Sequence, residues 1–175
     1  MNTKNKKSII ISAIIALSFL SGSIISCNNI EFPARQSLKD STVLPAFSIL
    51  LKDTTTKFDI GKIPTGRPIL LIFFGPNCPY CDTLTRNILS HIYMLKDVRL
   101  FMLSVAYFHD TKVYEEKYQL NKYDNIMLGQ TYDNSFNNFK FSGYPLVVVC
   151  DRNKKIKLAN IGPLTVDTIR AIIDK

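Results

Sequence analysis

The sequence lacks the features that mark several classes of protein. It has no tryptophan, and its four cysteines among 175 residues are too few for a fold built on disulfides. No run of lysine or arginine accompanies the net charge of +8, so a nucleic-acid partner is not expected. There is no internal repeat and no low-complexity block. A hydrophobic content of 46% is too high for a disordered chain, and the length fits one folded domain.

The N-terminus carries part of the positive charge. Lys4, Lys6 and Lys7 precede an apolar run over residues 8–25, and no acidic residue occurs among the first 26. The remaining 149 residues hold 19 basic and 14 acidic side chains, which is a mild surplus. A basic start, an apolar run and small residues before a break are typical of a secretory signal. We therefore expect residues 1–26 to be a signal peptide that directs the chain out of the cytoplasm.

The end of this run, Ile24-Ile25-Ser26-Cys27, resembles a bacterial lipobox. The resemblance implies that Cys27 is acylated and becomes the first residue of the mature protein. An uncleaved membrane anchor is the alternative, because about 18 apolar residues can nearly span a bilayer. Both interpretations place the chain in the cell envelope, on the extracytoplasmic (periplasmic) side, where glutathione does not keep thiols reduced. Residues 28–43 are polar, so the segment 27–43 is expected to be a lipidated tether and 44–175 the folded domain.

Apolar runs alternate with helical patterns along the domain. The runs at 69–74, 98–107 and 146–150 predict buried strands, and a turn after the last leads to a further strand at 156–159. Two short extended pieces are expected at 47–51 and 58–60. Helices are predicted after Cys81, from a cap at Asp110 through Leu120, over 135–139, and from a cap at Thr165. This alternation predicts an α/β or α+β sandwich.

The segment Cys78-Pro79-Tyr80-Cys81 lies between the first buried strand and the first helix. A thiolate at a helix N-terminus faces unpaired N–H groups and the positive end of the helix dipole, which lower its pKa. The two intervening residues let the second thiol reach the first and resolve a mixed disulfide. Pro79 suits the first helical turn, where its missing N–H costs nothing. The pattern predicts Cys78 as the exposed nucleophile and Cys81 as the more buried resolving thiol.

The stretch 44–82, together with Gly143-Tyr144-Pro145 before the run LVVVC, resembles thioredoxin-like proteins. The resemblance extends over roughly residues 44–173, and it is strongest to the membrane-tethered thiol–disulfide oxidoreductases of the bacterial envelope. It implies a thioredoxin fold, which is an α/β fold with a central mixed β-sheet flanked by helices, here with a short N-terminal β extension. It also implies that Pro145 is a cis-proline facing the cysteine pair and shielding it from metals, and that the backbone of Tyr144 pairs with an extended substrate segment.

This resemblance implies an enzyme that exchanges dithiol for disulfide with exported proteins, in the first instance as a reductase. The redox equivalents come from the Cys78–Cys81 pair and a membrane redox partner, so neither a cofactor nor a metal is expected. The lipid on Cys27 supplies the contact with the membrane. A disulfide oxidase or isomerase is an alternative, and so is a non-catalytic binding module of the same fold. A buried, inert cysteine pair would favour the binding module.

Three positions depart from the family pattern. Asn77 stands where thioredoxins usually carry tryptophan, and Ile72 stands where they carry a buried aspartate that assists proton transfer. Leu84 occupies a position at which many tethered reductases have glutamate. Deprotonation of Cys81 must therefore rely on water or on another group.

Other roles for the cysteine pair have less support. A zinc site would need two more ligands from Cys150, His91 and His109, and none of these forms a second close pair. Cys150 ends an apolar strand and is expected in the core, whereas His91 is expected at the helix surface. A copper chaperone would use one more residue between the cysteines, and the pattern of a peroxide-reducing site does not occur before either cysteine. Glutaredoxins share the CPYC sequence, but an exported chain lacks the cytosolic glutathione pool.

Overall fold

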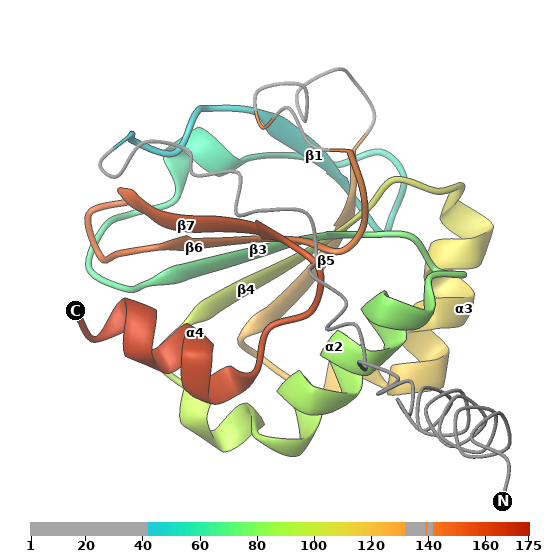
Figure 1. Cartoon of the computed structure of the whole chain (residues 1–175). Helices are drawn as coiled ribbons and strands as arrows, with labels where there is room; N and C mark the ends of the chain where they lie inside the picture. The colour runs from blue at the N-terminus through green and yellow to red at the C-terminus, as the bar shows by residue number, and fades with distance from the viewer. Residues whose placement is uncertain (1–41, 132–138, 140–141) are drawn as a thin grey trace, which may run out of the picture. The chain divides into compact units, whose positions relative to one another are not determined.

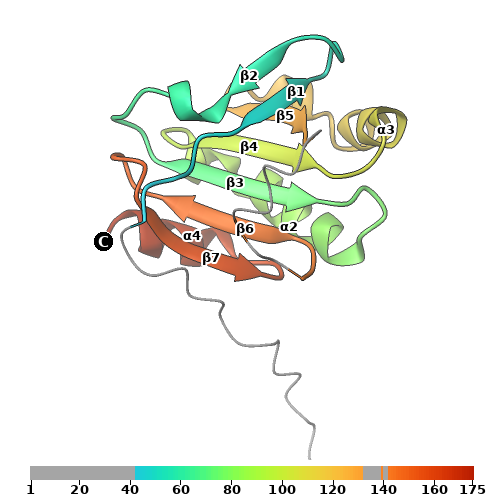
Figure 2. The same ribbon diagram turned by 90° about the horizontal axis from the view of Figure 1, so that it is seen from above.

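The computed structural model describes residues 42–131, 139 and 142–175 (Figure 1). In this part of the chain seven strands form one mixed sheet, in the order β2-β1-β5-β4-β3-β6-β7 (Figure 2). The strands are β1 (Ser48–Leu51), β2 (Lys57–Asp59), β3 (Ile69–Phe74), β4 (Arg99–Ser104), β5 (Ile126–Gln130), β6 (Leu146–Cys150) and β7 (Ile156–Ile161). The described α-helices are α2 (Pro79–Ser90), α3 (Phe108–Tyr118) and α4 (Val166–Ile173), and short 3-10 turns span Ile60–Lys62, Ile92–Leu95 and Leu120–Lys122.

The centre of the sheet is parallel and both of its sides are antiparallel. Strands β3, β4 and β5 run parallel, with α2 crossing over from β3 to β4 and α3 from β4 to β5. On one side β6 pairs antiparallel with β3 and β7 with β6. On the other side β1 pairs antiparallel with β5, and β2 pairs with β1 as a hairpin. The carboxyl ends of the parallel strands and the start of β6 therefore meet at one edge of the sheet.

Both faces of the central strand are buried, as the unbroken run ILLIFF predicts. All six residues of β3 are buried. The side chains of Leu70, Ile72 and Phe74 pack with residues of α2 and α4 and with Tyr114 of α3 on one face. Figure 1 shows these helices on the same side of the sheet. Those of Ile69, Leu71 and Phe73 pack on the opposite face, where the covering residues come from the N-terminal extension and from Phe139: Leu44, Phe47, Ile49, Ile60 and Ile63.

Several sequence predictions of local structure are confirmed. The buried strands at β3, β4 and β6 are present, and Thr165 caps α4 by accepting a hydrogen bond from the Thr168 N–H at 3.2 Å. The prediction that Asp110 caps a helix is wrong. The helix α3 begins at Phe108 with Tyr107 as its N-cap, so Asp110 lies in the first turn, where a negative charge suits the helix dipole. The helix expected over 135–139 lies outside the described residues apart from Phe139.

Strand β5 has no counterpart in the sequence prediction. Its sequence IMLGQ contains Gly129, a residue that weakens strand propensity. The structure explains this glycine, because a Cβ atom at position 129 would lie 2.7 Å from Cδ1 of Ile49 in β1. Glycine lets the N-terminal hairpin pair closely with β5 at Leu51↔Gly129.

The contacts of the domain begin slightly before the expected boundary at Leu44. Val43 forms an isolated antiparallel bridge with Lys155, and the carbonyl of Thr42 accepts a hydrogen bond from Ile156 N–H at 2.9 Å. The folded domain therefore includes at least two residues that the sequence assigned to the tether. None of the described helices is long and apolar enough to cross a membrane.

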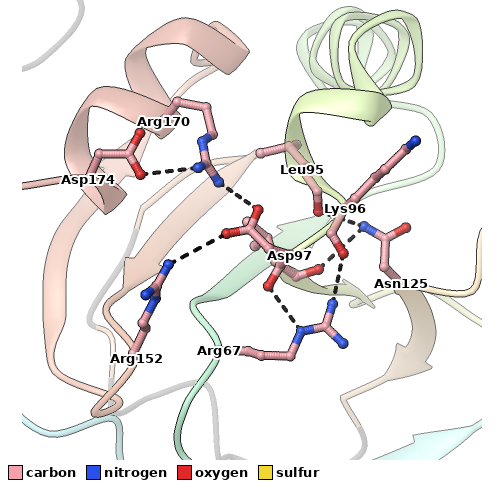
Figure 3. Close-up of polar contacts among 9 residues, drawn as sticks. Arg67, Leu95, Lys96, Asp97, Asn125, Arg152, Arg170 and Asp174 are labelled. Atoms are coloured by element: carbon pink, nitrogen blue, oxygen red, sulfur yellow. Dashed lines mark hydrogen bonds and ion pairs between the residues drawn. The ribbon is translucent and has the colours of Figure 1, made fainter.

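A polar network ties the elements together at the edge of the sheet where β3 and β4 begin (Figure 3). The carboxylate of Asp97 pairs with Arg170 of α4 at 2.8 Å and lies 3.9 Å from Arg152 in the β6–β7 turn. Arg67, just before β3, donates to the carbonyls of Lys96 and Asp97 at 2.9 and 3.0 Å. Because the strands are parallel, this network and the cysteine pair lie at opposite edges of the sheet.

Candidate functional site

Cys78 is the N-cap residue of α2, directly beyond the carboxyl end of β3. Its backbone is extended, with φ −97° and ψ 115°, and Pro79 occupies the first helical turn. The Cys78 Sγ atom accepts a hydrogen bond from the N–H of Cys81 at 3.3 Å. This amide is one of the donors that a helix leaves without a partner in its first turn, so it favours negative charge on the sulfur.

The two thiols differ in exposure, as the sequence predicts. Cys78 is partly exposed, whereas Cys81 is 1% exposed and packs in the core against the helix-covered face of the sheet. Both are free thiols in this structure. Burial raises the pKa of the Cys81 thiol far above its ordinary value, and the neighbouring Cys78 raises it further. Cys78 is thus accessible to a molecule from solvent, whereas Cys81 is accessible only to a group already at the site.

The loop before β6 brings Tyr144 and Pro145 to the same place. The Tyr144–Pro145 peptide bond is cis, as the resemblance implies. The thiol of Cys78 donates a hydrogen bond to the Tyr144 carbonyl at 3.7 Å, although the two residues are 66 positions apart in the chain. Pro145 is buried, while Tyr144 is half-buried. Burial raises the pKa of the Tyr144 hydroxyl, so this side chain is neutral at physiological pH.

The remaining motif residues surround Cys78 at the surface. Asn77, Pro79 and Tyr80 are exposed, and 52% of the Tyr80 surface is accessible. Ile72 and Leu84 are fully buried apolar side chains in the cluster that contains Cys81. No carboxylate therefore occupies either position at which related proteins were expected to carry one. Cys27, the expected lipidation site, lies outside the described residues.

A charged group that the sequence did not reveal lies next to Cys81 in the chain. Asp82 is the next residue along α2, and its Oδ2 atom accepts a hydrogen bond from Nζ of Lys117 on α3 at 2.8 Å. Burial favours the neutral acid, but the hydrogen bond from Lys117, the nearby Tyr118 hydroxyl and the charges of Lys117 and Arg86 together outweigh it and lower the pKa of Asp82, so that the carboxylate is ionised. The sequence signal is the acidic residue in the first turn of a helix, but its partner 35 residues away cannot be found without the fold.

The other titratable candidates are not part of this site. Cys150 is fully buried on the opposite face of the sheet from Cys81, and burial raises the pKa of its thiol to about 12. Its predicted place in the core is confirmed. His91 is half-buried at the end of α2, where its Nδ1 atom lies 3.0 Å from the Asn87 carbonyl, and His109 is exposed on α3. No group of three metal-ligating side chains occurs among residues 42–131, 139 and 142–175.

This arrangement of sheet, helices and cysteine pair is a thioredoxin fold. Similar solved structures include the thioredoxin domain of a thiol-disulfide oxidoreductase from Bacteroides vulgatus, with a TM-score of 0.61, 20% identity, and 77% of this chain and 95% of that chain covered. A thiol:disulfide interchange protein from Bacteroides sp. matches with a TM-score of 0.61 and 18% identity, over 77% of this chain and 88% of that chain. A secreted disulfide oxidoreductase from Mycobacterium tuberculosis matches with a TM-score of 0.60 and 17% identity, over 73% of this chain and 94% of that chain.

The predicted thioredoxin fold is therefore confirmed. Because the sequence identities to these three structures are 20% or lower, the likeness concerns the fold alone. No protein-family model and no curated protein matches the sequence.

Proposed function

We propose that this protein is a thiol–disulfide oxidoreductase that exchanges its Cys78–Cys81 dithiol with disulfides of exported proteins, as a reductase. The observation that carries the proposal is the unequal placement of the two thiols. Cys78 is partly exposed at a helix N-cap, and the buried Cys81 donates its N–H to the Cys78 sulfur. A structural disulfide in a binding module would not need one cysteine at the surface.

The exchange proceeds in two substitutions at sulfur. The Cys78 thiolate attacks one sulfur of the substrate disulfide, the substrate S–S bond breaks, and one substrate thiolate leaves. Cys81 then loses its proton and attacks Cys78 Sγ, which forms the Cys78–Cys81 disulfide and releases the second substrate thiolate. Two electrons pass from the protein to the substrate, and a membrane partner with its own dithiol returns them. No bound cofactor takes part in these steps.

Tyr144 is proposed to hold the substrate. Its carbonyl lies 3.7 Å from Cys78 Sγ, and an extended substrate segment beside the nucleophile would be within reach of the same backbone. Tyr80, two positions after Cys78, is 52% exposed. The solved structures of similar fold include proteins described as thiol-disulfide oxidoreductases and as a thiol:disulfide interchange protein, which supports the same kind of reaction here.

The proposed location is the outer surface of a membrane of the cell envelope. The basic start, the apolar run and the sequence Ile24-Ile25-Ser26-Cys27 support cleavage before Cys27 and acylation of its thiol. Labelling cells with a radioactive or alkyne-bearing fatty acid tests this part of the proposal. Incorporation that is lost in the Cys27→Ala variant is expected, and unchanged incorporation would contradict a lipid anchor at this residue.

The reduction potential of the pair tests the direction of exchange. It is measured by equilibrating the full chain, in detergent, with defined ratios of reduced and oxidised dithiothreitol and of glutathione. We expect a value toward the thioredoxin end of the known range, about −270 mV, since a reductant must hold its electrons weakly. A value near about −120 mV would make the protein a disulfide donor or an isomerase, because about 30 mV corresponds to roughly 1.4 kcal/mol.

The Cys81→Ser variant is expected to accumulate mixed disulfides. Cys78 is still able to attack a substrate, but the serine hydroxyl is not able to release it, so the intermediate persists. Trapped complexes are detected as reducible bands above the monomer on non-reducing gels after expression in an oxidising compartment. The absence of such bands, with the same variant folded and exported, would contradict the two-step mechanism.

A further inference from the structure

The ion pair between Asp82 and Lys117 is partly buried at the protein surface, and Asp82 follows the resolving Cys81 in the chain. The Asp82 side chain is 22% exposed and that of Lys117 is 48% exposed. Lys117 contacts Oδ2, whereas Oδ1 of the same carboxylate is buried and has no hydrogen-bond partner. The ammonium group in direct contact with the Asp82 carboxylate therefore comes from a different helix, α3.

Lys117 is held in place by aromatic side chains of its own helix. Its Nζ atom lies 4.9 Å from the ring centroid of Tyr118 and 6.0 Å from that of Tyr114. Both distances are within the range of cation–π attraction. The two rings pack at 4.8 Å, and Tyr114 packs at 4.6 Å on Phe74, the last residue of β3. These contacts favour a position of the ammonium beside α2.

The groups that face Asp82 come from two helices. Lys117 and Tyr118 approach from α3, and Arg86 lies one turn further along α2. Burial and the nearby carboxylate raise the pKa of the Tyr118 hydroxyl, so this group stays neutral, and as a neutral hydroxyl it helps to lower the pKa of Asp82. Arg86 is exposed and solvated, and it acts on Asp82 only through space. Lys117 is the cation in direct contact.

The groups that face Cys81 are Cys78 and Asp82 on α2, Tyr114 on α3, and Tyr144 before β6. Burial raises the pKa of both tyrosines, so both are neutral when Cys81 reacts. Once Cys78 is bound to substrate in a mixed disulfide it carries no charge. Among the described residues, the charge that then acts on Cys81 is that of Asp82, which Lys117 contacts.

We propose that Lys117 is a positioning residue for the second step of exchange: it neutralises Asp82 and so allows Cys81 to lose its proton. Without Lys117, the Cys81 thiolate would have to form beside a second anion in a partly buried place, where like charges repel strongly. With Lys117 in contact, the proton of Cys81 passes to solvent, the thiolate attacks Cys78 Sγ, and the substrate sulfur leaves. This inference rests on the proposed exchange function.

The reaction with Ellman's reagent, an aromatic disulfide that releases a coloured thiolate, separates the two steps in the full chain. Attack by Cys78 releases the first equivalent at a rate that rises with reagent concentration. Attack by Cys81 on the mixed disulfide releases the second equivalent at a rate independent of reagent concentration. The pH midpoint of this second phase reports the deprotonation of Cys81.

The Lys117→Met variant is expected to raise the midpoint of the second phase by about one pH unit, which is about a tenfold slower resolution at neutral pH. The Lys117→Gln variant should behave in the same way and guards against a local packing effect of methionine. The Asp82→Asn variant is expected to lower the midpoint. In the double variant the loss of Lys117 should have no further effect, since the charge it compensates is gone. The first phase should be unchanged in all of them.

A matched pair of controls lies at the other edge of the sheet. Arg170 and Asp97 form an ion pair with the same 2.8 Å separation, so Arg170→Met and Asp97→Asn remove the same charges far from Cys81. Neither should move the second phase. A slower second phase in Asp82→Asn would overturn the proposal, because Asp82 would then act as the proton acceptor. If the unaltered protein shows no second phase, the proposed exchange function is contradicted. If it shows both phases and Lys117→Met leaves the second phase unchanged, only the proposed role of Lys117 is contradicted.

Discussion

Replacing Cys78 with serine is expected to abolish disulfide reduction while leaving the fold intact. The thiolate is the nucleophile in the first substitution, and the side-chain contacts of this position among the described residues, with the Tyr144 carbonyl and the Cys81 N–H, include no base that would activate a serine hydroxyl. We expect the rate to fall by a factor on the order of 10³ or more, to the level of the uncatalysed reaction. The measurement is the reduction of a fluorescent peptide disulfide by the dithiothreitol-reduced protein.

The fold should survive because serine suits the position. Cys78 Sγ accepts the Cys81 N–H as an N-cap, and serine is among the residues preferred for this contact. The thermal midpoint of Cys78→Ser should therefore match or exceed that of the unaltered protein. Cys150→Ala is the control, since this thiol is fully buried on the opposite face of the sheet and should not affect exchange. Substantial activity in Cys78→Ser would remove Cys78 from the mechanism.

The parts of the fold that the sequence predicts best are those with uniform burial. The run at β3 is apolar because both faces of this strand are covered, and the helical spacing after Cys81 follows from one buried face of α2. The cap at Thr165 is local chemistry within four residues. Each of these signals is contained in a short window, so no knowledge of tertiary structure is needed to read it.

Strand β5 and the start of α3 depend on distant residues instead. The pairing of β5 with β1 requires a glycine where a strand pattern would favour a larger residue, and the reason is contact with Ile49, 80 positions earlier. Helix α3 begins at Phe108, and its N-cap residue Tyr107 makes no side-chain cap hydrogen bond. Asp110 is the nearest residue of a type that caps helices, and it lies three positions after the true N-cap. Tertiary packing outweighs local propensity at both places.

The candidate site divides along the same line. The roles of Cys78 and Cys81 follow from their order at a helix start, and Tyr144 and Pro145 could be placed beside them only through resemblance to a known fold. The contact between Asp82 and Lys117 could not be predicted from a local sequence pattern, and the resemblance to thioredoxin-like proteins did not imply it. It arises because α2 and α3 lie side by side, and this proximity is a property of the sheet order.

The second large effect is expected from Ile72→Asp, which places a carboxylate where thioredoxins carry one. Ile72 is 1% exposed in the middle of β3, paired with Met102 on β4 and Val147 on β6, and it packs in the same cluster as Cys81. The described residues of this cluster are mainly aliphatic and aromatic, so an aspartate there would find few donors to replace water. We expect the variant to lose about 4 kcal/mol or more of unfolding free energy at neutral pH, which is much of the stability of a typical domain.

The pH dependence identifies the cause of this loss. A buried carboxylate has a raised pKa in the folded state, whereas in the unfolded chain the pKa is about 3.9. Between these two values the folded protein binds more protons than the unfolded chain, so the stability of Ile72→Asp falls as pH rises through this range. The neutral Ile72→Asn variant has nearly the same shape and should lose stability without this pH dependence. Urea unfolding of both variants from pH 4.5 to 7.5 measures the difference. Equal pH profiles would mean that the carboxylate at position 72 reaches water or a cation. In that case the interior of this protein would tolerate an ionised aspartate at the position where thioredoxins carry one.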